Sequence, residues 1–185
     1  MDAFIKKILL TCTFFFLVTC TLNATQLEPT FANSDVNLVL NGQGARDKFF
    51  IDLYIGGLYL VEKNSSAKDI IEADKPMNIR LHIVSSLISS EKMRDGIQEG
   101  FKNSTNNNIE PLKEKIDTFI SVFQEEIKEN DIYDFVYVPK IGTKVYKNSK
   151  LQKTIEGLDF KKALYGIWLS QAPAQESLKK DMLGL

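Results

Sequence analysis

The chain has few of the residues that bind transition metals or perform thiol chemistry. It contains two cysteines and one histidine in 185 residues, and both cysteines, Cys12 and Cys20, lie near the N-terminus. A domain that begins after them has no thiol, which excludes disulfides, thiol catalysis and cysteine-ligated metals. His82 alone cannot build a zinc site. No nucleophile-elbow sequence supports a Ser-His-Asp hydrolase. We therefore expect no metal site.

The sequence also lacks an apolar run long enough to cross a bilayer. The run from Ile8 to Val18 is about half of the roughly 20 residues that a membrane span needs. Lys6 and Lys7 precede it, and the small residue Ala24 follows, which is the pattern of a secretory signal peptide. We predict a signal peptide at 1–24, a periplasmic or secreted protein, and no transmembrane segment in the mature chain. An alternative is a lipid anchor on Cys20, because LVTC (17–20) loosely resembles a lipoprotein cleavage box.

The charges show no excess of either sign. The whole chain has a formal net charge of −1, and removal of residues 1–24 changes this to about −2, because two lysines and one aspartate are lost. Nucleic-acid-binding proteins carry basic patches, so we exclude that class. With 44% hydrophobic and 25% charged residues, the composition is that of an ordinary globular domain. We predict a polar lead-in at 25–35 and one domain at 36–185; the sequence does not determine the oligomeric state.

Hydrophobic patterning predicts a mixture of strands and helices. Strands are expected at 36–40, 48–55, 57–62, 77–83, 131–139, 143–148 and 153–156. A turn at Asn148 and Ser149 would pair the last two as a hairpin. The Gly42/Gly44 pair is expected to form a turn, since it lacks the third glycine of a dinucleotide fingerprint and a strand follows it. This argues against a nucleotide cofactor, and we predict no cofactor at all.

Helices are expected at 67–74, 91–101, 111–127, 159–170 and 174–183, with Ser66 as the cap of the first and with Ser89 and Ser90 directly before the second. Strands and helices are grouped instead of alternating strictly. This order favours an α+β fold, with an antiparallel sheet covered by helices on one side.

Arg46 is the most informative single residue. It is one of three arginines, and it lies between a glycine-rich stretch and the apolar run FFIDLYIGGLYL. A guanidinium stays charged at physiological pH, so it must meet an anion or face water. Tyr54 and Tyr59 could close an apolar slot with Arg46 at one end, which suits an amphipathic acid. The alternative is that Arg46 pairs with Asp47 or Asp52 at a solvated strand end.

Four stretches together resemble one known family. NGQGARDKFFIDLYIGGLYL (41–60) is similar to the opening of the chalcone isomerase family, in particular its secreted bacterial chalcone-isomerase-like branch. SSEKMRDGIQEGFKN resembles the serine-glutamate-lysine helix of the family, and KIDTFISVFQEEIKENDIYDFVYVPKIGTKVY resembles its long helix and the hairpin that follows. ALYGIWLSQAPAQESLKKDML resembles its closing helix and proline turn. The resemblance implies an open-faced β-sandwich: a large antiparallel sheet with helices layered on one face and a ligand cleft between them.

The resemblance also suggests site residues. Arg46 matches the cleft arginine, which holds an oxygen or carboxylate of the ligand, and Lys92 matches a helix lysine. The hydrogen-bonding residues of catalytic members are replaced, with Tyr54, Ser89, Gly96 and Gly166 in their places. Loss of one such donor typically costs about 10²- to 10³-fold in rate.

The expected function is therefore that of a non-catalytic member of this family, which binds a fatty acid or similar amphipathic carboxylate in an apolar cleft. The ligand-binding residues would be Arg46 as the charge partner, with Tyr54 and Lys92 at the mouth. The alternative is an isomerase, an intramolecular lyase acting on an enone-like substrate with Tyr54 as a replacement acid. Fold analogy alone supports that alternative.

Overall fold

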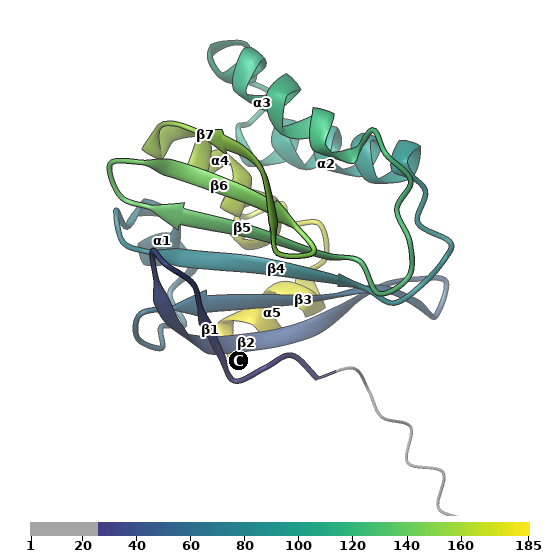
Figure 1. Cartoon of the computed structure of the whole chain (residues 1–185), viewed down its shortest axis with the longest axis horizontal. Helices are drawn as coiled ribbons and strands as arrows, with labels where there is room; N and C mark the ends of the chain where they lie inside the picture. Colours follow the sequence, from purple (N-terminus) through teal and green to yellow (C-terminus); the bar gives the residue numbers. More distant parts are fainter. Residues whose placement is uncertain (1–25) are drawn as a thin grey trace, which may run out of the picture.

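The structure is a computed structural model that describes residues 26–185, so the predicted signal peptide and the alternative anchor at Cys20 lie outside the described residues. Seven antiparallel strands form one sheet in sequence order, each paired with the next (Figure 1). The strands are β1 (Thr30–Ala32), β2 (Asn37–Lys48), β3 (Ile51–Leu60), β4 (Met77–Ile83), β5 (Ile132–Val138), β6 (Gly142–Lys147) and β7 (Lys150–Ile155). The β6–β7 turn is at Asn148 and Ser149, as predicted.

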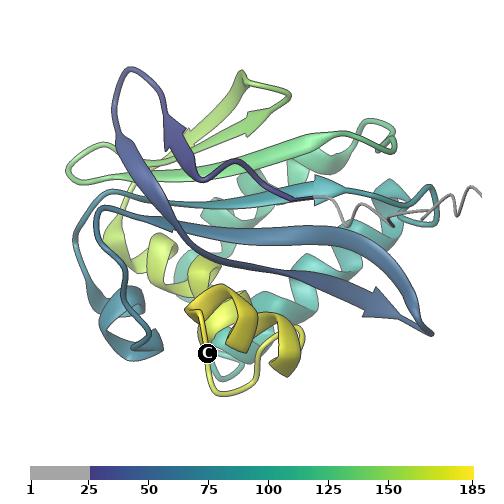
Figure 2. The same ribbon diagram turned by 90° about the horizontal axis from the view of Figure 1, so that it is seen from below.

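The helices pack on one face of the sheet, which confirms the predicted α+β architecture (Figures 1 and 2). They are α1 (Ala67–Glu72), α2 (Ser90–Ser104), α3 (Lys113–Ile120), α4 (Leu158–Leu169) and α5 (Glu176–Leu183). The Ser66 and Ser89 side chains accept hydrogen bonds from backbone N–H groups in the first turns of α1 and α2, so the predicted cap at Ser66 is confirmed and Ser89 is the N-cap of α2. The helix expected at 111–127 is shorter, because 3₁₀ turns flank α3 at Glu110–Leu112 and Ser121–Phe123. No helix within residues 26–185 has the length and apolar character to cross a membrane.

The glycine-rich stretch is not a turn, and that prediction was wrong. Residues 36–62 form two long strands instead of three short ones. A Cβ atom on Gly42 would lie 2.1 Å from the carbonyl oxygen of Asp181, and one on Gly44 would lie 2.3 Å from its Oδ2. The glycines therefore allow α5 to approach the backbone of β2. The chain reverses instead at Phe49 and Phe50, which have φ angles of 52° and 64°.

The folded domain begins before Val36, where the sequence placed its start. β1 lies within the predicted lead-in and pairs with β2 in the register Thr30↔Val39. Leu27 and Phe31 are buried in a second apolar cluster, which includes Ile55, Tyr59 and Val136 and lies on the face of the sheet away from the helices. The lead-in therefore covers the outer face of the sheet.

An ion pair between Arg80 and Asp134 lies beneath the lead-in. Asp134 accepts hydrogen bonds from Arg80 Nε at 2.8 Å and Nη2 at 2.9 Å, and from Asn78 Nδ2 at 2.7 Å. The Arg80 guanidinium also packs over the Phe31 ring at 5.2 Å. A two-pronged pair of this kind links strands β4 and β5 with defined geometry.

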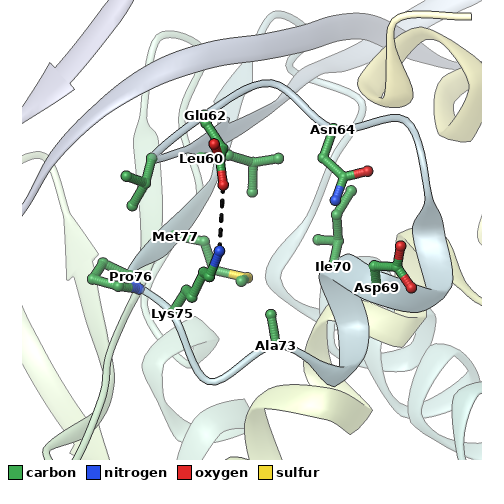
Figure 3. Close-up of a pocket in the computed structure, with 10 residues that line it drawn as sticks. Leu60, Glu62, Asn64, Asp69, Ile70, Ala73, Lys75, Pro76 and Met77 are labelled. Carbon is green, nitrogen blue, oxygen red and sulfur yellow. Dashed lines mark hydrogen bonds and ion pairs between the residues drawn. The ribbon is translucent and has the colours of Figure 1, made fainter.

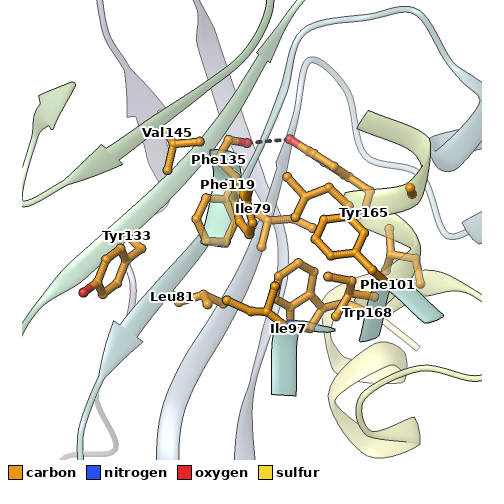
Figure 4. Close-up of a cluster of buried hydrophobic side chains, with 14 of the residues drawn as sticks. Ile79, Leu81, Ile97, Phe101, Phe119, Tyr133, Phe135, Val145, Tyr165 and Trp168 are labelled. Atoms are coloured by element: carbon orange, nitrogen blue, oxygen red, sulfur yellow. Dashed lines mark hydrogen bonds between the residues drawn. The ribbon is translucent and has the colours of Figure 1, made fainter. Parts of the chain in front are cut away.

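The main core lies between the sheet and the helices (Figure 4). Phe119 of α3 meets Phe101 of α2 and Phe135 of β5 edge to face, with ring centroids 5.9 and 5.1 Å away. The buried Tyr165 hydroxyl of α4 lies 2.7 Å from the Phe135 carbonyl and 2.9 Å from the Met77 carbonyl. These contacts fix α2 and α4 on the sheet and so determine the walls of the site described next.

Candidate functional site

A cavity of about 640 Å³ opens between the end of the β2–β3 hairpin, α2 and the segment that joins α4 to α5. Its volume is within the roughly 300–1,000 Å³ typical of small-molecule sites. Most of the lining is apolar, with Leu53, Leu81, Met93, Ile97, Ile167 and Trp168 among the contributing residues. The charged lining residues are Arg46, Lys48, Lys92, Asp95 and Glu99. The site thus combines an apolar interior with a few charged groups.

Arg46 of β2 lies opposite Tyr54 of β3 in the strand register. Its Nη1 donates to the Asp47 carbonyl oxygen at 2.7 Å and to Gln175 Oε1 at 2.6 Å. No carboxylate within residues 26–185 forms an ion pair with Arg46. The alternative that Arg46 pairs with the Asp47 or Asp52 carboxylate is therefore wrong. The guanidinium is held in place while its charge has no partner in the described part of the chain.

Gln175, at the N-terminus of α5, fixes this arrangement. Its Oε1 accepts from the Asp47 backbone N–H at 3.2 Å as well as from Arg46, and its Nε2 donates to Asp47 Oδ1 at 2.5 Å. One amide side chain therefore occupies the Asp47 carboxylate and orients the guanidinium. The sequence predictions did not include Gln175, and no local pattern around it indicates this role.

Tyr54 is buried, with 8% of its surface exposed. Its hydroxyl oxygen accepts a hydrogen bond from Trp168 Nε1 at 3.0 Å, while its own proton has no acceptor among residues 26–185. Burial raises the pKa of Tyr54, and the Trp168 hydrogen bond and the Arg46 charge oppose that rise without cancelling it. The hydroxyl therefore stays protonated at neutral pH and can donate to an oxygen in the cavity.

Lys92 lies in the first turn of α2, where its Nζ donates to the Leu87 carbonyl oxygen at 3.1 Å. Its side chain is exposed and lines the cavity together with Asp95 and Glu99. The structure thus places all three predicted ligand-binding residues, Arg46, Tyr54 and Lys92, around one cavity.

Gly96 and Gly166, two positions where the resemblance implies a polar residue in catalytic members, have different surroundings. Gly96 lines the cavity, and a Cβ atom added to it would meet no atom within 4 Å. Gly166 does not line the cavity, and a Cβ atom there would lie 2.8 Å from the Ser104 Cβ atom. Gly96 therefore contributes open space to the site, whereas Gly166 allows α4 to pack closely on α2.

A smaller pocket of about 140 Å³ lies between the end of β3, α1 and the start of β4 (Figure 3). Lys75 and Glu62 form an ion pair across its mouth at 3.3 Å. It contains no arginine, and the volume is below the usual range for small-molecule sites. No group of three or more metal-ligating side chains is found within the described residues. The larger cavity is therefore the candidate site.

An antiparallel sheet with helices on one face, and a cavity between them that holds an arginine, defines a protein of the chalcone isomerase-like type. The chain belongs to the chalcone isomerase-like family, whose model matches residues 20–184. The fold is similar to the crystal structure of a fatty-acid binding protein from Arabidopsis thaliana, with a TM-score of 0.69 and 20% sequence identity. That match covers 85% of this chain and 90% of the plant chain. No curated protein matches the sequence.

Proposed function

We propose that this protein binds a fatty acid or similar amphipathic carboxylate, and that it is not a catalyst. The observation that carries the proposal is a guanidinium without a carboxylate partner in residues 26–185, at the edge of an apolar cavity of about 640 Å³. Arg46 is only partly exposed to water, and a ligand carboxylate would give its charge a partner with charge-assisted hydrogen bonds. The similarity in fold to a plant fatty-acid binding protein supports the same class of ligand.

The proposal gives each predicted residue a role. The carboxylate head group would lie against Arg46, where charge-assisted hydrogen bonds are strong, and would accept a hydrogen bond from the Tyr54 hydroxyl. The acyl chain would lie along the apolar wall formed by Met93, Ile97 and Ile167. Lys92 would provide a second positive charge at the mouth.

We also propose that the protein belongs to the secreted bacterial branch of the family and acts in the periplasm or outside the cell. The support is the pattern of residues 1–24, with Lys6 and Lys7 before an apolar run and Ala24 after it. The intact mass of protein purified from an expressing bacterium tests this proposal. A chain that begins after Ala24 agrees with it, a lipidated Cys20 points to the anchored alternative, and a full-length chain contradicts both.

The ligand is tested by organic extraction of purified protein, followed by mass spectrometry. We expect amphipathic carboxylic acids at a substantial fraction of one per chain. Extracts without such acids, together with no binding of added palmitate, would contradict the proposal. Incubation with a chalcone separates the isomerase alternative, because loss of enone absorbance above the uncatalysed rate would show catalysis.

A further inference from the structure

The tip of the β2–β3 hairpin exposes aromatic side chains to solvent. Phe49 and Phe50 are 83% and 103% exposed. They are the two central residues of the turn, since Lys48 pairs with Ile51 across it. The tip projects from the sheet beside α2 (Figure 2). Two adjacent, fully exposed phenylalanines place a large apolar surface in water, which is a marker of an interaction site.

The backbone of this turn makes the choice of phenylalanine still less favourable. Both residues have positive φ angles, 52° and 64°, as in the type I′ hairpin turn, which favours Asn-Gly and similar pairs. The β6–β7 turn has nearly the same angles, 49° and 65°, and there the residues are Asn148 and Ser149. The same backbone geometry in the same sheet thus carries ordinary turn residues at one hairpin and two phenylalanines at the other. The conformational preference of the turn therefore does not explain the two phenylalanines.

The exposed tip is continuous with the mouth of the cavity. Phe49, Ile51 and Leu87 line the cavity, and Ile51 and Leu87 are themselves about half exposed. Phe50 extends this apolar rim outward and does not line the cavity. A molecule that leaves the apolar surface in contact with the rim would therefore meet apolar side chains as far as the cavity, beside the charged Lys48 and Lys92 of the lining.

We propose that the rim formed by Phe49, Phe50, Ile51 and Leu87 inserts into the surface of a lipid bilayer and joins the cavity to the membrane. Stable protein interfaces bury about 800 Å² on each partner, and a narrow, protruding tip of two residues is too small to provide this area against a second copy of the chain. A deformable bilayer can accept such a tip. The idea that the rim delivers an amphipathic acid rests on the proposed function. The insertion itself does not.

The charges near the rim indicate how the contact is made. Lys48 lies beside Asp47 and Asp52, and Lys92 lies beside Asp95, so neither sign dominates. Attraction to anionic head groups is therefore small, and burial of the aromatic side chains is the main contribution. Insertion of this kind should depend on Phe50 and only weakly on salt.

The test is flotation of the protein with phosphatidylcholine vesicles. The protein is used in the form isolated from the expressing cell. Phe50→Gly is the variant of choice, because glycine is preferred in this turn and Phe50 does not line the cavity. We expect the wild type to float at both low and high salt, and Phe50→Gly to lose about tenfold or more in binding. Val61→Ser is the matched control, since Val61 is 53% exposed at the opposite end of β3 and its replacement should change nothing.

Three results of the flotation experiment would overturn the inference: a wild type that stays in the soluble fraction, equal flotation of Phe50→Gly, or binding that high salt abolishes. A concentration-dependent dimer that Phe50→Gly disrupts, without vesicle binding, would assign the rim to a second copy and also overturn it. The amount of bound acid is measured by organic extraction of the same preparations. Flotation without acids would contradict the proposed function alone, and acids without flotation would contradict the membrane contact alone.

Discussion

Trp168 donates its indole N–H to the hydroxyl oxygen of Tyr54 across 3.0 Å, and both side chains are buried at the wall of the cavity. The pair joins β3 to α4 at the place where the proposed head-group site meets the core. Because it is buried, neither partner can exchange the bond for one to bulk water. Tyr54 therefore has two functions in this account, one in the packing of the cavity wall and one towards the ligand.

Tyr54→Phe should destabilise the fold, because it leaves the Trp168 N–H buried without an acceptor. The expected loss in the free energy of unfolding is about 1–3 kcal/mol. Urea denaturation, followed by circular dichroism, measures it. An unchanged midpoint would mean that the Trp168 N–H finds another acceptor and that the bond is not structural.

Gly96 and Gly100 lie one helical turn apart in α2, yet replacement by alanine should have opposite effects. Gly96→Ala meets open space and gains helix propensity, so we expect about 0.5–1 kcal/mol of added stability. Gly100→Ala would place its Cβ atom 2.7 Å from Ile167 Cγ2, so a loss of about 1–3 kcal/mol is expected from overpacking. The two variants form a matched pair in one urea experiment. Equal signs for both would contradict the packing described here.

Gly96→Leu should shorten the acyl chains that the protein accepts. The new side chain would occupy part of the cavity, since nothing lies within 4 Å of the added Cβ atom. Mass spectrometry of extracted acids should show a shift from longer to shorter chains, with the total occupancy less affected. Gly96→Ala is the control, because one methyl group removes little volume. An unchanged chain-length distribution would place the acyl chain elsewhere.

Lys161 should make stability depend on pH. It is fully buried, and its Nζ donates to the carbonyl oxygens of Ile70, Ile71 and Ala73 at 2.7–2.9 Å, which caps the C-terminal end of α1. Burial, with the neighbouring Lys162 charge, lowers the pKa of Lys161 from 10.5 to about 8. Between these values the unfolded chain binds more protons than the folded one, so stability should rise with pH.

The measurement is the urea midpoint between about pH 7.5 and 9, where the tyrosines of the unfolded chain remain mostly protonated. The wild type should gain stability across this window. Lys161→Met should be less stable overall, because three carbonyl groups lose their donor, and it should lack this gain. A wild type whose midpoint is flat or falls would show that the three carbonyl oxygens keep Lys161 protonated.

Local patterns in the sequence predicted the elements whose causes are local. Ser66 and Ser89 cap helices through atoms three residues away, and Asn148 and Ser149 form a turn that their own chemistry favours. The glycines of β2 were misread because the reason for them is Asp181 of α5, distant in sequence. The turn at Phe49 and Phe50 was missed because its residues are poor turn formers.

The residues of the candidate site also differ in whether local sequence could predict them. Arg46 and Tyr54 could be paired from one short segment, because they face each other across a single hairpin. The contact of Gln175 with Arg46 could not be predicted, since the two residues are 129 positions apart and nothing near Gln175 in the sequence indicates it. The Trp168 bond to Tyr54 likewise spans 114 residues. The sequence could thus indicate the charge at the cavity edge but not the groups that orient it.

The central claim is that Arg46 recognises a carboxylate, and the most direct measurement compares the affinities for palmitate and for its methyl ester, which lacks the charge. The wild type should prefer the acid by about 10- to 100-fold, as expected for a hydrogen bond to a charged group. Arg46→Ala should lose that preference, while Arg94→Ala, which alters an arginine outside the cavity lining, should retain it. Equal preference for the acid in wild type and Arg46→Ala would contradict the account.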